Sequence, residues 1–170
     1  MHSYNIFQDW KANSTKGRIV MVFFRIATMA NINKGMFLIM IPYLVFYRIV
    51  IESFVGIELP YRLKAGKRLR LMHGQALVVN GDAIIGANCT LRHSTTIGNV
   101  KKENGSIGSP TIGNNVEIGS NTCLIGNIEI GDNVIIGAGS VVVKSIPPNS
   151  VVVGNPGRVI KTNNSKIHNE

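Results

Sequence analysis

An aliphatic residue returns at every sixth position through the second half of the chain, and this spacing constrains the fold more than any other feature. The series consists of Ile112, Ile118, Leu124, Ile130, Ile136 and Val142. A period of six fits neither an α-helix nor an ordinary strand, but it fits a short strand followed by a tight corner. Three such units close a triangular coil of eighteen residues, which stacks Ile112 beneath Ile130 and Ile118 beneath Ile136. The repeat therefore predicts a parallel β-helix, in which each coil buries its apolar face against the next.

The same spacing begins earlier in the chain, but it is interrupted twice. One series starts at Ile57, and after a shift in phase a second series runs from Val79 to Ile97. An irregular polar segment at 99–110 then precedes the regular repeats. Roughly five coils, each rising about 4.8 Å, would account for this part of the chain. We therefore expect N-terminal helices at 1–56, a β-helix domain at 57–155 and a C-terminal tail at 156–170.

The segment before the repeats predicts two helices, at about 16–31 and 34–55. The second contains the most apolar stretch of the chain, MFLIMIPYLVFY at 36–47, which ends before Arg48 and includes Pro42. Twelve residues are too few to span a bilayer. Because apolar residues lie nearly all round this helix, we expect it to be buried against the main body or another subunit. Contact with a membrane surface is the alternative.

Basic residues are concentrated before the repeats. Residues 1–71 hold eleven of the eighteen Lys and Arg but three of the nine Asp and Glu. The densest run is RLKAGKRLR at 62–70. Such a surface could meet a phosphate, an anionic sugar polymer, a membrane face or nucleic acid, or it could simply be solvated. No aromatic residues are interleaved with the run, so we do not expect nucleic acid as the partner.

Cysteine usage and the N-terminus bear on the compartment. Cys89 and Cys123 lack the spacing of metal ligands and indicate a reducing environment. The first 18 residues are polar and contain no apolar core of a signal peptide. These features predict a cytoplasmic protein. The basic region adds the expectation of peripheral contact with the inner membrane face or with an anionic glycan.

The repeats resemble those of the hexapeptide-repeat acyltransferases, a family of left-handed parallel β-helices that usually form trimers. Within that family, the stretch IELPYRLKAGKRLRLMHGQALVV at 57–79 is similar to a coil of the serine O-acetyltransferases. Over nearly the whole chain the likeness is greatest to the short acetyltransferases of exopolysaccharide synthesis, of the colanic acid type. The resemblance implies a left-handed β-helix that works as a homotrimer.

The same resemblance assigns a catalytic pair. In serine acetyltransferases an acidic residue precedes the catalytic histidine by fifteen positions, and Glu58 and His73 have that spacing. Two positions depart from the serine acetyltransferase pattern. Met72 stands where an Asp precedes the catalytic histidine, and Ser109 stands where a second active-site histidine precedes Pro110. These departures argue against serine as the acceptor.

The C-terminal coils resemble galactoside acetyltransferases, which bind acetyl-CoA along the groove between neighbouring rods. The positions that match their cofactor contacts are Ser120, Ala138, Val143, Lys144 and Arg158. Lys161 stands where that family has Arg, and Val143 replaces a Thr. The resemblance thus implies acetyl-CoA as the donor substrate, and it implies no metal.

Acetyl transfer to a hydroxyl needs a base, and histidine titrates in the range that suits this work. A lone histidine is more often structural than catalytic, and the matched acidic residue reverses that preference for His73. We expect His73 to accept the proton, Glu58 to orient the imidazole, and backbone N–H groups such as that of Gly74 to stabilise the oxyanion. His93 is the rival base. Arg92 and His93 are candidates for binding the acceptor, with a packing role at the corner as the alternative.

The residues are compatible with three functions. The first is an O-acetyltransferase that acts on a hydroxyl of a sugar or surface polysaccharide, with serine as the alternative acceptor. The second is a metal enzyme similar to the trimeric β-helical carbonic anhydrases, which would need three histidine ligands, whereas the repeat region offers His73 and His93. The third is a non-catalytic trimeric scaffold. The first agrees best with the resemblance, and the acceptor itself is not specified by the sequence.

Overall fold

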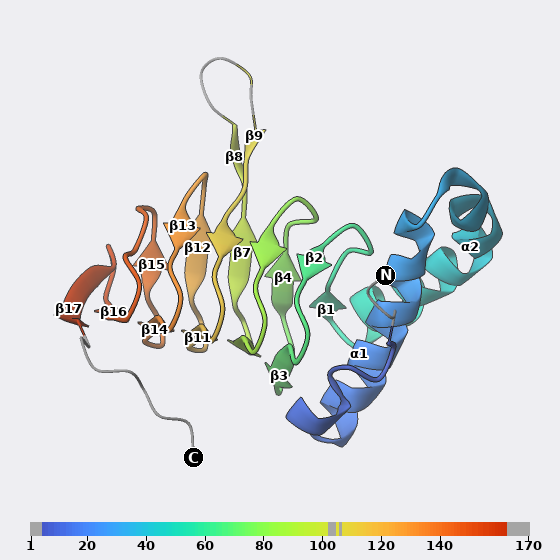
Figure 1. Ribbon diagram of the computed structural model, residues 1–170, viewed down its shortest axis with the longest axis horizontal. Helices are drawn as coiled ribbons and strands as arrows, with labels where there is room; N and C mark the ends of the chain where they lie inside the picture. Colours follow the sequence, from blue (N-terminus) through green and yellow to red (C-terminus); the bar gives the residue numbers. More distant parts are fainter. Residues whose placement is uncertain (1–4, 102–104, 106, 163–170) are drawn as a thin grey trace.

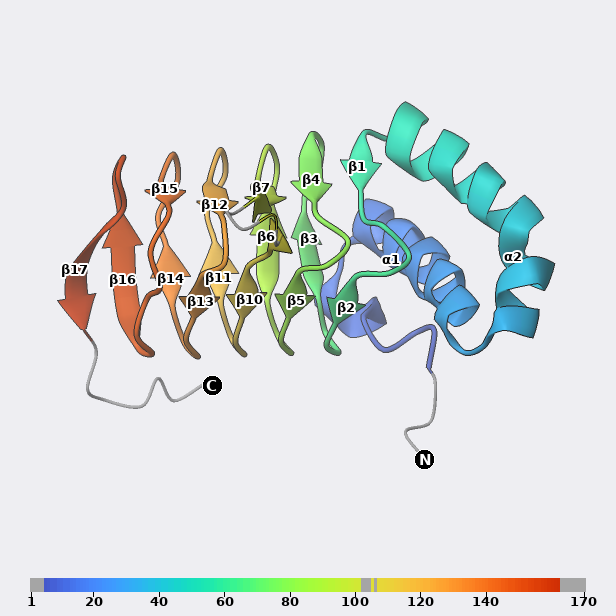
Figure 2. The same cartoon turned by 90° about the horizontal axis from the view of Figure 1, so that it is seen from above.

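The protein is a rod with helices at one end, as the computed structural model in Figures 1 and 2 shows. The structure describes residues 5–101, 105 and 107–162. The rod runs from strand β1 beside the helices to strand β17 at the opposite end (Figure 2). The predicted parallel β-helix, with about five coils and a helical N-terminal region, is confirmed.

Three parallel sheets form the sides of the rod. The first sheet contains β1 (Ile57–Glu58), β4 (Leu77–Val79), β7 (Thr96–Gly98), β12 (Cys123–Ile125) and β15 (Val141–Val142). The second sheet contains β2 (Lys64–Ala65), β5 (Ile84–Ile85), β10 (Thr111–Ile112) and β13 (Glu129–Ile130). The third sheet contains β3 (Arg70–Met72), β6 (Thr90–Arg92), β11 (Glu117–Ile118), β14 (Ile135–Ile136), β16 (Ser150–Val153) and β17 (Arg158–Thr162). The chain visits one strand of each sheet in turn, so every coil has three sides.

The strand register agrees with the repeat. Ile112 pairs with Ile130, and Ile118 pairs with Ile136, as the eighteen-residue coil predicts. These aliphatic side chains point inward and are fully buried. Stacked ladders of buried Ile, Leu and Val, each side chain stabilising the fold by about 1.5–3 kcal/mol, form the core of the rod.

The first interruption of the repeat is a two-residue insertion at one corner. Met72 pairs with Arg92, and Val79 pairs with Ile97, so seven positions in the first coil oppose five positions in the second. The additional residues therefore lie in the turn that follows β3 and begins with His73. The shift in phase seen in the sequence is located at this corner.

The second interruption is a hairpin. Strands β8 (Val100–Lys101) and β9 (Ile107–Gly108) pair antiparallel and project sideways from the rod (Figure 1). This excursion explains the irregular segment predicted at 99–110. The coil closes again at β10, where Thr111 pairs with Ile84 of the coil before it.

The helical region contains the two predicted helices. A short 3₁₀ turn, Trp10–Ala12, precedes α1 (Thr15–Thr28), and a second 3₁₀ turn, Met29–Asn31, leads to α2 (Lys34–Tyr47). The helix continues as the π-helical segment η3 (Arg48–Phe54). This segment includes the β-branched residues 49–51, whose side chains crowd a regular α-helix.

The expected length of the apolar helix is wrong. Its α and π segments form one continuous helix from Lys34 to Phe54, 21 residues that are long and apolar enough to cross a membrane. The estimate of twelve residues failed because the helix continues through Arg48, whose charge is paired with Glu52 one turn later. The helix is little buried within one chain, since 11% of its most apolar window lies inside the protein, and its packing against another subunit remains a prediction. Tyr47 and Ile51 are its buried residues.

Polar side chains of the helical region cap the open edge of the first coil. Asn13 donates to the carbonyl of Leu69 and accepts from the N–H of Leu71, while Asp9 accepts from the N–H of Leu69. Arg25 forms a buried ion pair with Asp9 at 2.7 Å. An uncovered sheet edge is prone to pairing with other chains, so these contacts end the solenoid as a capping repeat does.

Arg25 and Tyr47 extend this cap to the neighbouring strands. Arg25 donates to the carbonyls of Ala65 and Gly66, and the Tyr47 hydroxyl donates to the carbonyl of Leu59. Burial, the main cause, together with the nearby Glu52 carboxylate, raises the pKa of Tyr47 far above its usual range. Tyr47 therefore remains a neutral hydrogen-bond donor.

At the other end, β17 turns back and pairs antiparallel with β16. Part of the segment expected as a C-terminal tail thus extends the third sheet, while 163–170 lie outside the described residues. The boundaries predicted at 56 and 155 remain predictions.

Candidate active site

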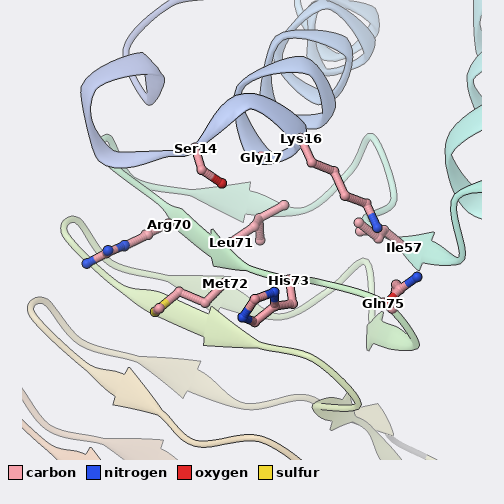
Figure 3. A pocket seen from close by; sticks show the side chains of 9 residues that line it. All are labelled: Ser14, Lys16, Gly17, Ile57, Arg70, Leu71, Met72, His73 and Gln75. Atoms are coloured by element: carbon pink, nitrogen blue, oxygen red, sulfur yellow. The ribbon is translucent and has the colours of Figure 1, made fainter.

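His73 occupies the corner between the third and first sheets, directly after β3. Its φ of 68° lies in the left-handed region, which is unfavourable for a residue with a side chain. Its imidazole is exposed and lines a cavity of about 390 Å³ between the first coil and the start of α1 (Figure 3). Other coil corners, such as Ala76 and Ser94, have the same left-handed φ. The exposed side chain that lines a cavity is therefore what marks His73 as a candidate functional residue.

The two-residue insertion displaces His73 from the regular stack. Higher in the rod, the N–H of Asn121 donates to the carbonyl of His93, and the N–H of Gly139 donates to the carbonyl of Ser120. The equivalent N–H of Ser94 donates to Gln75 instead of His73. Gln75 therefore takes the regular corner position, and His73 bulges outward beside it.

His93, Ser120 and Ala138 lie above one another along this corner. The register of the third sheet supports the stacking, because Leu91 pairs with Ile118 and Ile118 pairs with Ile136. Adjacent coils are about 4.8 Å apart, so His93 and Ala138 are separated by roughly 10 Å along the rod. We call His73, His93, Ser120 and Ala138 the corner column. It brings both candidate bases and two of the predicted acetyl-CoA residues to one edge.

The two histidines are in contact range of each other. Their ring centroids are 6.0 Å apart with an interplanar angle of 72°. Nδ1 of His93 is buried and has no hydrogen-bond partner within the described part of the chain. A buried nitrogen without a partner is costly. In this chain it lies beside the His73 ring without access to solvent.

Arg92 points to a different partner. Its guanidinium donates to the carboxylate of Glu117 at 2.6 Å, and both side chains are partly exposed. The structure therefore does not test the predicted role of Arg92 in acceptor binding. Its charge is compensated by Glu117.

Glu58 is not in contact with His73. Within the described residues, no ion pair or hydrogen bond joins the two. Glu58 lines a separate cavity of about 590 Å³ between α2 and the first coils, together with Arg48 and Glu52. There, burial raises the pKa of Glu52, Arg48 opposes the rise and Glu58 adds to it. That Glu58 orients the His73 imidazole remains a prediction, because the two side chains line separate cavities of one chain.

The remaining acetyl-CoA positions divide into two groups. Arg158 pairs with Val153 at the start of β17, close to the upper end of the corner column, and Lys161 lies on the same exposed strand. Val143 and Lys144 are exposed and follow β15, on the far side of the first sheet from Ala138. One chain therefore assembles Ser120, Ala138 and Arg158 along one edge and places the other two elsewhere.

Sequence reasoning missed the contribution of α1 to the site. Ser14, Lys16 and Gly17 line the His73 cavity, and Figure 3 shows the Lys16 side chain reaching over it from the helix. Arg70 and Gln75 complete its polar lining. These residues are far from His73 in the sequence. They reach the first coil because Asn13 docks the start of α1 against it. Among these lining residues, Arg70 was indicated by the sequence, because it belongs to the basic run at 62–70.

The two residues that depart from the serine acetyltransferase pattern lie at different edges of the rod, Met72 beside His73 and Ser109 at the opposite edge of the first sheet. Met72 lines the His73 cavity, where a carboxylate was expected in that family. The hydroxyl of Ser109 donates to the side-chain oxygen of Asn80 at 3.1 Å. Within the described chain, no group of three His, Cys, Asp or Glu side chains has an arrangement suited to a metal ion.

Comparison with protein families gives one match. Residues 109–144 fit the family described as bacterial transferase hexapeptide (six repeats). Among curated proteins, the chain is 42% identical over 118 residues to WcaB of Escherichia coli (strain K12), whose name as a colanic acid biosynthesis acetyltransferase is provisional. The alignment covers 69% of this chain and 72% of that protein. A serine acetyltransferase of Staphylococcus aureus (strain N315) is 42% identical over 114 residues, which cover 67% of this chain and 53% of that protein.

Solved structures give the same family. The serine acetyltransferase of Neisseria gonorrhoeae in complex with serine superposes with a TM-score of 0.76 at 29% identity, covering 92% of this chain and 67% of that one. The serine acetyltransferase of Brucella abortus strain S19 in complex with coenzyme A has a TM-score of 0.75 at 30% identity, covering 87% and 57%. The chain thus spans little more than half of several serine acetyltransferases that it matches. Its repeats, its fold and its similarity to WcaB together show that it belongs to the hexapeptide-repeat acetyltransferases.

Proposed function

We propose that the protein transfers an acetyl group from acetyl-CoA to a hydroxyl of a sugar or surface polysaccharide, with His73 as the general base. The observation that carries this proposal is the corner column. It brings an exposed histidine to the base of the same edge that holds Ser120 and Ala138. A relative of the same fold binds coenzyme A.

His73 would act twice in a direct transfer. It first accepts the proton of the acceptor hydroxyl while that oxygen bonds to the thioester carbonyl carbon. The carbon–sulfur bond then breaks, and the same imidazole returns the proton to the departing sulfur. Backbone N–H groups at the corner, including that of Gly74, would stabilise the negative charge on the carbonyl oxygen. His93, whose ring lies beside that of His73, would position the acceptor hydroxyl.

The donor would lie along the corner column, with its acetyl end at His73 and its phosphates near Arg158. Val143 and Lys144 do not lie on this edge in one chain. They follow β15 and therefore lie at the other edge of the first sheet from Ala138. A homotrimer accounts for both groups, because a neighbouring rod would bring its own Val143 and Lys144 to the groove. The trimer would also be the setting in which Glu58 reaches an imidazole.

A sugar hydroxyl is favoured over serine as the acceptor. Met72 supplies a thioether in the His73 cavity where the serine acetyltransferases place a carboxylate, so the group that would meet the amino group of serine is absent. WcaB, the relative matched over most of its length, is assigned to colanic acid biosynthesis. Serine remains the second candidate acceptor.

The test is transfer of a labelled acetyl group from acetyl-CoA to serine, simple glycosides and polysaccharides in parallel. We expect labelled sugar or polysaccharide and little labelled serine. Transfer to serine alone would replace the proposed acceptor. Absence of transfer to every hydroxyl acceptor would favour the non-catalytic scaffold.

A further inference from the structure

A second hollow beside the His73 cavity is lined by basic residues. It has a volume of about 880 Å³, and its cations are Lys11, Lys67, Arg68 and Arg70. Within the described residues, none of these four side chains forms an ion pair. The one carboxylate in the lining, Glu117, is neutralised by Arg92. We call this hollow the basic groove, and it presents four uncompensated positive charges.

The basic groove adjoins the His73 cavity, because Arg70 lines both hollows. Arg70 and His73 are three residues apart at the end of one strand, a separation of roughly 10 Å in extended chain. Lys16 adds a further cation on the His73 side. A chain-like ligand that lies in the groove would therefore reach His73 with one of its units.

Arg68 stands out within the groove because it interrupts a regular column. The same left-handed corner is occupied by an asparagine in each of the four following coils, Asn88, Asn115, Asn133 and Asn149. Their side chains form a ladder of hydrogen bonds of 3.0, 3.0 and 2.9 Å. Arg68 has a φ of 61° there, although Asn tolerates that conformation better than a long side chain does. An arginine kept at an unfavourable position points to a use for its charge.

We propose that the basic groove binds an acidic glycan, carrying carboxylate or phosphate groups, as the acceptor of the acetyl transfer. Guanidinium groups bind both kinds of anion through paired hydrogen bonds. Asn88 and Thr90 in the lining offer amide and hydroxyl groups to sugar hydroxyls. The lining contains no aromatic side chain on which a nucleobase would stack, and a flat lipid surface does not fill a hollow. This inference rests on the proposed acetyltransferase function.

The experiment compares wild type, Arg68→Asn and the matched control Lys101→Gln, which removes one exposed charge on the hairpin outside the groove. Binding of polygalacturonate, phosphomannan and neutral dextran is measured by calorimetry at two salt concentrations. We expect Arg68→Asn to weaken binding of an acidic polymer about two- to fivefold, and the double variant Lys67→Gln/Arg68→Asn to weaken it at least tenfold. Binding should also fall as salt rises. The two acidic polymers show whether carboxylate or phosphate is recognised.

Arg68→Asn should extend the asparagine ladder, so its melting temperature should equal or exceed that of wild type. Reduced polymer binding in this variant then cannot come from unfolding. Equal binding by Arg68→Asn and wild type, an equal loss in Lys101→Gln, or equal affinity for dextran would each overturn the proposal. Acetyl transfer to a neutral glycoside is assayed in the same samples. Acetyl transfer to the acidic polymers is assayed alongside. Absence of transfer to every one of these acceptors would count against the enzyme function, while polymer binding reports on the groove alone.

The exposed face of α2 and η3 carries a second, independent inference. Leu38, Val45 and Ile49 recur along one side of this helix and are 64%, 55% and 50% exposed. In Figure 2 the helix lies at the end of the molecule farthest from β17. The opposite side of the helix is held to the rod by the buried residues Tyr47 and Ile51. It therefore cannot cross a bilayer while it remains docked.

We propose that this face lies on an anionic membrane surface. Its net charge suits such a surface, because Lys34 at the start of the helix is exposed and forms no ion pair within the described residues, while the exposed Arg48 is offset by Glu52. The described carboxylate of the helix, Glu52, is largely covered and paired with Arg48. Apolar residues flanked by cations are typical of helices that rest in the membrane interface.

Co-sedimentation with vesicles tests this second proposal. Wild type should bind vesicles that contain phosphatidylglycerol more strongly than vesicles of phosphatidylcholine alone. The variant Leu38→Ser/Ile49→Ser should lose at least tenfold in binding, and Ile107→Ser, which changes an exposed apolar residue on the hairpin, should not. Equal binding by the double variant would overturn the proposal. A double variant that instead dissociates a larger assembly in light scattering would show that the face contacts a second copy, which also overturns it.

Discussion

The upper coils and the first coil are built from the same repeat, yet they differ at their corners. In the upper coils the corner that leads into the third sheet is always asparagine, and the aliphatic ladder continues without a break. In the first coil the corresponding corner is Arg68, and the next corner is lengthened by two residues at His73. The first change places a charged side chain where the repeat would place a neutral one, and the second adds His73 beside the regular position, which Gln75 occupies.

This difference separates stability from function along the rod. The upper coils supply a rigid edge, since each coil is fixed by the one beneath it. The first coil has no coil beneath it and depends on the helical cap for its unpaired backbone groups. The left-handed backbone of His73 is tolerated there because the cap and the core fix the surrounding structure.

The largest expected effect concerns the cap. Replacing Arg25 with Met leaves Asp9 buried without its partner, and breaking a buried ion pair in this way costs about 3–5 kcal/mol. Urea unfolding should show this loss in the free energy of unfolding. Lys64→Met, at an exposed position of the same coil, is the matched control. A loss below about 1 kcal/mol would show that the first coil does not need the cap.

The next effect concerns the regular core. Ile118 is fully buried in the ladder, so Ile118→Ala should lower the free energy of unfolding by about 2–5 kcal/mol. Ile84→Ala removes the same atoms from a side chain that is 41% exposed, and it should cost less than half as much. Thermal and urea unfolding measure both. Equal losses at the two positions would contradict the ladder as the main source of stability.

A smaller effect is expected at the donor edge. Ala138 is exposed on the corner column, so Ala138→Trp should obstruct acetyl-CoA and raise its KM about tenfold, or about 1.4 kcal/mol, without lowering the melting temperature. Thr111→Trp, exposed on the second sheet, should leave KM unchanged. Steady-state kinetics at a saturating acceptor concentration measure the KM for acetyl-CoA of both variants. An unchanged KM in Ala138→Trp would remove the corner column as the donor site.

The smallest effect is a difference between the two cysteines. Burial raises the pKa of Cys89 to about 11, so at pH 8 this group remains a protonated thiol and is a poor nucleophile. Cys123 is partly exposed. Iodoacetamide should therefore modify Cys123 first, as mass spectrometry of peptides would show, and both should react after denaturation. Faster reaction at Cys89 in the native protein would mean that the lower coils open readily.

The rod could be predicted from the sequence because its register follows from side-chain spacing alone. Ile112 on Ile130 and Ile118 on Ile136 are consequences of an eighteen-residue coil, and the structure confirms both. The exposure of α2 could not be predicted in this way. An apolar helix has the same composition whether it packs on protein or rests on another surface, and only tertiary contacts distinguish the two.

The candidate site was predictable in part. The resemblance supplied His73, and the repeat shows that Ser120 and Ala138, eighteen residues apart, share a corner. The contribution of Lys16 depends on how α1 docks, and the separation of Glu58 from His73 depends on which sheet each residue faces. Neither follows from distance along the chain. The insertion that exposes His73 was visible as a shift in phase, although the sequence did not show which corner absorbed it.

The most direct measurement compares His73→Ala with His93→Ala for both acetyl transfer and acetyl-CoA binding. If His73 is the base, its loss should lower the rate of transfer by about 10²–10⁴-fold, while calorimetry shows acetyl-CoA bound as tightly as by wild type. His93→Ala, which in this account positions the acceptor, should raise the acceptor KM more than it lowers kcat. Near-normal transfer by His73→Ala, with the rate lost in His93→Ala instead, would contradict the central claim and move the base one coil along the rod.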